Sequence, residues 1–114
     1  ESPVAAALRE LREETGLVPE AFYNLSRVES FYLHGSDEIA LIPVFAAVVA
    51  AEAQVVLSAE HDDFRWLDLA AAGSTLAWPR ERRTAVDLGI VLANGTAGLL
   101  EGVLRVDLST RSRD

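Results

Sequence analysis

The chain has 114 residues, of which 50% are hydrophobic and 25% charged, a composition typical of one folded domain rather than of a disordered segment. Its net charge of −8 argues against a nucleic-acid-binding surface, because polyanions are held by basic patches. The absence of cysteine excludes disulfides, zinc–thiolate sites and thiol catalysis.

The first seventeen residues carry the signals of a short helix with an acidic flank. Ser2 is a candidate N-cap, and Gly16 is suited to a left-handed stop. Three carboxylates of this helix fall within an arc of roughly 100°, since positions three and four apart are neighbours on a helix surface: Glu10, Glu13 and Glu14. Such charges repel one another and oppose the helix dipole, so we expect them to bind a divalent cation rather than form a solvated acidic face.

The next segment has the pattern of a β-hairpin. Residues 21–33 and 38–50 are rich in β-branched and aromatic residues, and residues 34–37 have turn chemistry. We expect the two strands to pair antiparallel. The apolar run over 39–51 is shorter than a membrane span requires, so we expect a buried strand and no membrane partner.

The second half of the chain predicts further short elements. We expect strands over 54–57 and 64–67, with Trp66 in the core, and a small helix over 68–72. A longer helix should begin at Pro79 and end near residues 94–95. Residues 99–108 fit either a strand or a helix, and residues 109–114 are expected to form a disordered tail. Helices that bracket strands predict an α/β sandwich.

Glu1, seven further residues and then Arg9-Glu10-Leu11-Arg12-Glu13-Glu14-Thr15-Gly16-Leu17 resemble the Nudix box, the signature of hydrolases that act on a nucleoside diphosphate linked to another group. The family's box begins with a glycine six residues before the first glutamate. The chain therefore resembles a single, N-terminally truncated Nudix domain over residues 1–114. The resemblance implies the Nudix-type α/β/α sandwich with a mixed sheet that lacks its first strands and exposes an edge.

The resemblance also implies a metal-dependent reaction. Mg²⁺, or Mn²⁺ as an alternative, would be bound by Glu10, Glu13 and Glu14, and a water activated by the metal would attack a phosphorus of the diphosphate. The segment from Glu60 to Leu67 is similar to an element of several Nudix subfamilies in which the glutamate is a further metal ligand or the base. Arg9 is expected to orient Glu1 or Glu10 through charge-assisted hydrogen bonds. His61 reads as a solvated loop residue and receives no role.

The substrate is less well defined by the residues. The Glu60 element and the Trp78-Pro79-Arg80 segment are similar to the branches that contain dihydroneopterin triphosphate and dATP pyrophosphohydrolases, and to bis(5′-nucleosyl)-tetraphosphatases. Tyr32, Trp78 and Arg80 are candidate substrate contacts, although a solvated helix start explains the last two as well. A non-catalytic nucleotide-binding domain or an inactive fragment are the alternatives. We expect a cytoplasmic protein, and a homodimer is compatible with the sequence.

Overall fold

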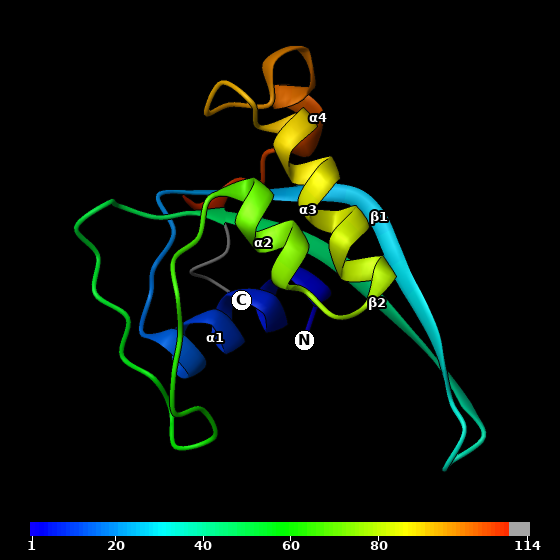
Figure 1. The fold of residues 1–114 in the computed structure, drawn as a ribbon. Helices are drawn as coiled ribbons and strands as arrows, with labels where there is room; N and C mark the ends of the chain where they lie inside the picture. The colour runs from blue at the N-terminus through cyan, green and yellow to red at the C-terminus, as the bar shows by residue number, and fades with distance from the viewer. Residues whose placement is uncertain (110–114) are drawn as a thin grey trace.

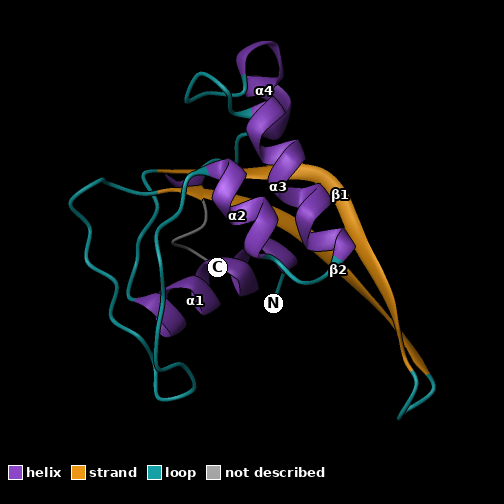
Figure 2. Cartoon of the chain, in the orientation of Figure 1, coloured by secondary structure: helices purple, strands orange, loops and turns teal. Residues whose placement is uncertain are grey.

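The computed structural model describes residues 1–109. Figures 1 and 2 show a bent two-stranded sheet with helices beside it. The elements in chain order are α1 (Pro3–Thr15), β1 (Ala21–Leu33), β2 (Glu38–Val48), α2 (Leu69–Thr75), α3 (Pro79–Val91), the 3₁₀ turn η1 (Gly98–Leu100) and α4 (Glu101–Leu104). Of the expected tail over 109–114, only Ser109 belongs to the described part, where its amide donates to Asp107 at 3.0 Å; the rest lies outside the described residues.

The capping signals of α1 act as the sequence predicts. The Ser2 hydroxyl oxygen accepts a hydrogen bond from the Ala5 amide at 3.1 Å. Gly16 has a φ of 71°, and its N–H donates to the carbonyl of Arg12 at 2.8 Å. The two ends of the helix are therefore set by local chemistry.

The predicted hairpin is confirmed. β1 and β2 pair antiparallel from Leu33 with Glu38 at the turn to Ala21 with Val48 at the open end. The register is irregular between Asn24 and Val28, and Val28 lies opposite Pro43, which has no N–H for the ladder. The hairpin bends, and its outer half projects away from the helices (Figure 1). This half leaves apolar side chains exposed, among them Ile39, Leu41 and Ile42.

The core lies at the inner half of the sheet. Its buried members are Tyr23, Leu25, Ala46, Ala97 and Leu104. Leu88 and Val91 of α3, and Leu92 directly after it, pack at the edge of the core. Residues 99–108, for which strand and helix were both open, form η1, α4 and one isolated bridge between Arg105 and Tyr23. The expected α/β class is confirmed, and within residues 1–109 the sheet has two antiparallel strands. None of the helices in this part of the chain combines the length and the apolarity of a bilayer span.

The strands expected over 54–57 and 64–67 do not form. Residues 54–57 are extended with alternating burial, but they dock on the end of a helix instead of on a strand. Trp66 is 65% exposed, so its predicted place in the core is wrong. An alternating pattern identifies two faces of an extended segment, whereas a strand also needs a neighbour that completes its hydrogen-bond ladder.

A buried tyrosine ties the last helix to the sheet. Tyr23 is 1% exposed, and its hydroxyl donates to the Glu101 carboxylate at 2.6 Å. The Ala97 amide donates to the same carboxylate at 2.7 Å. These hydrogen bonds, above all that from Tyr23, lower the pKa of Glu101, and the same contact raises the pKa of Tyr23.

The Glu101 contact predicts a defined acid dependence of stability. A carboxyl whose pKa is lowered by folding contributes stability above its unfolded pKa, and that contribution is lost as the pH falls through the folded value. Glu101→Gln should therefore lower the thermal midpoint at pH 7, and the gap to the native chain should narrow below about pH 4. Thermal unfolding at pH 7 and pH 3 checks this, with exposed Glu52→Gln as control. A gap that stays constant would contradict it.

Candidate metal site at the end of helix α1

Three side chains from two separate segments converge beside the C-terminal end of α1. Glu14, Glu60 and His61 each offer a ligand atom, and these atoms all lie within 4.8 Å of one another. Glu14 is half-buried, whereas Glu60 and His61 are exposed. The group combines two carboxylates and an imidazole at one open position.

The long loop between β2 and α2 brings Glu60 and His61 to this position. Figure 2 shows the loop passing the C-terminal end of α1. There the Val56 amide donates to the carbonyl of Thr15 at 2.7 Å, and the Ser58 amide donates to the carbonyl of Glu14 at 3.2 Å. The last carbonyls of a helix have no partner within the helix, so this docking satisfies two of them. The backbone of Glu14 is thereby held directly beside the loop.

A tight turn contains the two loop residues of the group, Glu60 and His61. The His61 amide donates to the carbonyl of Ser58 at 3.1 Å, which closes a turn with Glu60 near its tip. The Ser58 hydroxyl oxygen is buried and has no hydrogen-bond partner among residues 1–109. Ser58 therefore places an unused polar atom two residues from Glu60.

Gly16 allows the loop to come this close. Its φ of 71° lies in the left-handed region, and a Cβ built on it would meet the Cβ of Val56 at 3.3 Å. Both features favour glycine, because a side chain there would be strained and would push the loop away. The glycine that ends the helix thus also shapes the site.

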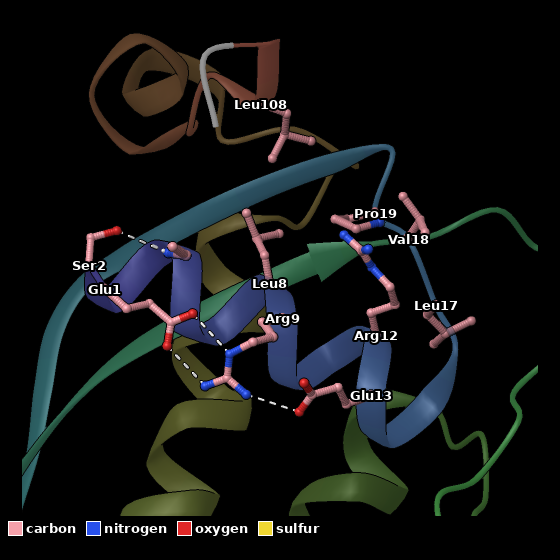
Figure 3. Close-up of a pocket in the computed structure, with 11 residues that line it drawn as sticks. Glu1, Ser2, Leu8, Arg9, Arg12, Glu13, Leu17, Val18, Pro19 and Leu108 are labelled. Atoms are coloured by element: carbon pink, nitrogen blue, oxygen red, sulfur yellow. Dashed lines mark hydrogen bonds and ion pairs between the residues drawn. The ribbon is translucent and has the colours of Figure 1, made fainter. Parts of the chain in front are cut away.

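Glu1, which precedes α1, and Glu13 of α1 gather around Arg9 (Figure 3). The guanidinium donates two hydrogen bonds to Glu1, at 2.9 and 3.0 Å, and one to Glu13 at 2.9 Å. The hydrogen bonds between Arg9 and Glu1 are the main cause that lowers the pKa of Glu1 and raises the pKa of Arg9. The predicted pairing of Arg9 with Glu1 is present, and the structure adds Glu13 as a second strong partner.

Glu10 and Glu13 lie at different angular distances around the helix from Glu14. Glu10 lies 3.9 Å from Arg9, and its side chain is 59% exposed. At about 100° per residue, it lies only about 40° around the helix from Glu14, whereas Glu13 lies about 100° away, on the Arg9 side. Within residues 1–109, neither of them joins the group of Glu14, Glu60 and His61.

Figure 3 also shows a cavity on this side of α1. It has a volume of about 930 Å³ and is bordered by the ion-paired Arg9 group and by apolar side chains that include Leu8, Leu17 and Leu108. Leu8 of α1 therefore faces an open hollow, and α1 has no fully buried residue.

The donor set suits a divalent cation. Carboxylate oxygens are the preferred ligands of Mg²⁺ and Mn²⁺, and an imidazole nitrogen is a stronger ligand for transition metals than for Mg²⁺. The exposed position leaves room for the phosphate oxygens that usually complete such a shell. The residues present thus fit a divalent cation.

The predicted substrate contacts lie elsewhere. Tyr32, Trp78 and Arg80 line one cavity of about 550 Å³, where the hairpin turn meets the start of α3. This cavity shares no lining residue with the Glu14 group. The three predicted contacts therefore line one cavity, but it is not the place where Glu14, Glu60 and His61 converge.

His61 is the residue that sequence reasoning passed over. Its two aspartate neighbours, Asp62 and Asp63, favoured a solvated loop residue. The available signal was its position directly after Glu60, because a residue next to a candidate site residue lies close to the same site.

Comparisons with known proteins agree with the box in the sequence. The NUDIX domain matches residues 1–88. An octanoyltransferase of Myxococcus xanthus is 41% identical over 87 residues, which cover 74% of this chain and 24% of that protein. The chain thus spans about a quarter of the length of this relative. No solved structure matches the chain.

Proposed function

The chain belongs to the NUDIX family, and on that premise we propose that it hydrolyses a phosphoanhydride bond in a nucleoside triphosphate or a related nucleoside diphosphate linked to another group. The observation that carries the proposal is the convergence of Glu14, Glu60 and His61 within 4.8 Å. These three residues come from the family's box and from a loop more than forty positions later. The backbone hydrogen bonds of Val56 and Ser58 bring the loop to the end of the helix, and the side chains that this contact places beside Glu14 are a carboxylate and an imidazole.

Each residue of the site has a proposed role. Glu14 and His61 bind Mg²⁺ or Mn²⁺, and Glu60 is either a further ligand or the base. Glu10, exposed and one turn before Glu14, turns toward the ion when substrate phosphates bind. Arg9 holds Glu1 and Glu13 in place, so Glu13 supports the helix surface and ligates the ion only if it leaves Arg9.

The bound ion would neutralise charge on the phosphates and lower the pKa of the attacking water. The chain itself supplies the orientation of the ligands, through the hydrogen bonds of Val56 and Ser58 to the end of α1. Glu60 is either a ligand or the group that removes the proton from water. Glu60→Gln separates the two roles, because a lost ligand weakens cation binding, whereas a lost base lowers turnover with cation binding intact.

A substrate panel is the direct test. The panel contains dATP, dihydroneopterin triphosphate, a bis(5′-nucleosyl) tetraphosphate and octanoyl-coenzyme A, the last because the M. xanthus relative is named an octanoyltransferase and coenzyme A contains a nucleoside linked through a diphosphate. Products are separated by chromatography after incubation with Mg²⁺ or Mn²⁺. Cation-dependent cleavage of one of them supports the proposal and identifies the bond. Nucleotide binding without any cleavage would favour a non-catalytic domain. The proposed location is cytoplasmic, where such nucleotides are abundant.

The proposed role of His61 as a ligand predicts that its loss affects Mn²⁺ more than Mg²⁺. An imidazole ligand contributes more to Mn²⁺ than to Mg²⁺ binding. His61→Gln is therefore expected to raise the Mn²⁺ concentration for half-maximal activity by about 10-fold, with a smaller change for Mg²⁺. Activity titrations with both ions check this, and His34→Gln, a change of the other histidine, is the control. Equal shifts for both ions would contradict the role.

A further inference from the structure

Ser58 joins the helix and the loop of the converging group through its backbone. Its amide donates to the carbonyl of Glu14 at 3.2 Å, and its own carbonyl accepts a hydrogen bond from the His61 amide at 3.1 Å. Glu60 lies two positions further on, within the same turn. The backbone of this serine is therefore in direct contact with both sides of the proposed cation site.

The hydroxyl of Ser58 is not used by the turn itself. A serine at the first position of a tight turn can accept a hydrogen bond from the backbone N–H two residues further on. Ser58 occupies this position in the turn closed by His61, yet its hydroxyl oxygen is buried and forms no hydrogen bond among residues 1–109. Buried polar groups are nearly always paired, because an unpaired one has lost its contact with water without compensation.

The carboxylate of Glu14 is the matching acceptor. Glu14 is half-buried, and its carboxylate forms no hydrogen bond or ion pair with the rest of residues 1–109, whereas Arg9 binds Glu1 and Glu13. Carboxylates that bind a cation are commonly oriented by a hydrogen bond from a further residue. An unused donor and an unused acceptor thus lie on two backbones that a hydrogen bond holds together, that of the Ser58 amide to the Glu14 carbonyl.

We propose that Ser58 is a positioning residue of the cation site, whose hydroxyl donates a hydrogen bond to the Glu14 carboxylate when the cation binds. The inference rests on the proposed function, because it deepens the description of that same site. Rotation about a single side-chain bond redirects a serine hydroxyl. The hydrogen bond occupies one carboxylate oxygen and leaves the other to the cation, so it fixes the ligand in its binding orientation.

Isothermal titration of the chain with Mn²⁺ tests the role. Ser58→Ala removes the hydroxyl but keeps both backbone hydrogen bonds, so the dissociation constant for Mn²⁺ should rise by about 10-fold. The thermal midpoint without cation should equal or exceed that of the native chain, because alanine leaves no buried hydroxyl without a partner. Ser58→Thr retains the donor and should bind Mn²⁺ more tightly than Ser58→Ala. Ser30→Ala, at an exposed serine of β1, is the matched control and should change neither measurement.

A double-mutant cycle identifies the residue through which Ser58 acts. In a Glu14→Gln background the charged acceptor is already lost, so adding Ser58→Ala should weaken Mn²⁺ binding by less than about 2-fold. If the effects of the two substitutions add in full, Ser58 does not act through Glu14 and the proposal is overturned.

Two further results would also overturn the positioning role. One is native Mn²⁺ affinity in Ser58→Ala, and the other is weaker binding together with a lower thermal midpoint in the absence of cation, which indicates a structural role. If Ser58→Ala binds Mn²⁺ normally while Glu14→Gln binds it weakly, the role of Ser58 fails and the proposed cation site stands. If neither substitution affects Mn²⁺ binding, the proposed function fails with it.

Discussion

Glu14→Gln is expected to lower kcat/KM for the cleaved nucleotide by about 10²–10⁴-fold. Glu14 is the one box residue that meets both Glu60 and His61, so its carboxylate is the link between the helix and the loop. The amide retains the shape of the side chain but not its charge, and an uncharged ligand neutralises none of the cation's charge. Steady-state kinetics with Mg²⁺ measures the effect.

Measurements of cation binding distinguish the loss of a metal ligand from a general loss of folding stability. Isothermal titration with Mn²⁺ should show weaker binding in Glu14→Gln, while thermal unfolding without cation should be nearly unchanged, because no described hydrogen bond to the Glu14 carboxylate is lost. Glu52→Gln, an exposed acid outside the group, should behave like the native chain in both measurements. An unchanged turnover in Glu14→Gln would remove the proposed mechanism.

Gly16→Ala is expected to damage stability and the site together. An alanine at a φ of 71° costs about 1–2 kcal/mol, because its Cβ crowds the backbone in the left-handed region. The same Cβ would lie 3.3 Å from the Cβ of Val56, so the docked loop must shift by a few tenths of an ångström. Since the loop carries Glu60 and His61, Mn²⁺ affinity should fall by about 10-fold or more.

Gly95→Ala is the matched control for this substitution. Gly95 also has a positive φ, of 83°, but nothing lies within 4 Å of a Cβ built on it. It should show a similar loss of stability in denaturant unfolding with unchanged Mn²⁺ affinity. Equal Mn²⁺ affinity in the two variants would show that the approach of Val56 does not position the ligands.

The sequence predicted the elements whose signals are local. Ser2, Pro3 and Gly16 act within one helical turn of the residues they cap, and the turn chemistry of 34–37 joins two strands that are neighbours in the chain. The Nudix box predicted the family, because its residues occupy fixed spacings in one short segment of the chain. These features need no knowledge of distant contacts.

The tertiary structure decided which acidic residues of α1 pair with Arg9 and which lie beside the loop. Sequence spacing places Glu10, Glu13 and Glu14 in one arc, but Arg9 draws Glu13 to one side. Glu14 meets Glu60 and His61 on the other side, because two backbone hydrogen bonds from Val56 and Ser58 hold the loop at the end of α1.

The same contacts explain why residues 54–57 form no strand. An extended segment looks alike in sequence whether it completes a sheet or covers the end of a helix, since alternation reports only which side faces the protein. The partner of residues 54–57 lies about forty positions away, and backbone groups form its hydrogen bonds. Every residue type offers these backbone groups, so the sequence pattern does not show which segment covers the helix end. The amino-acid sequence by itself determined the helix and its acidic side chains. Only the tertiary structure decided which carboxylates lie together.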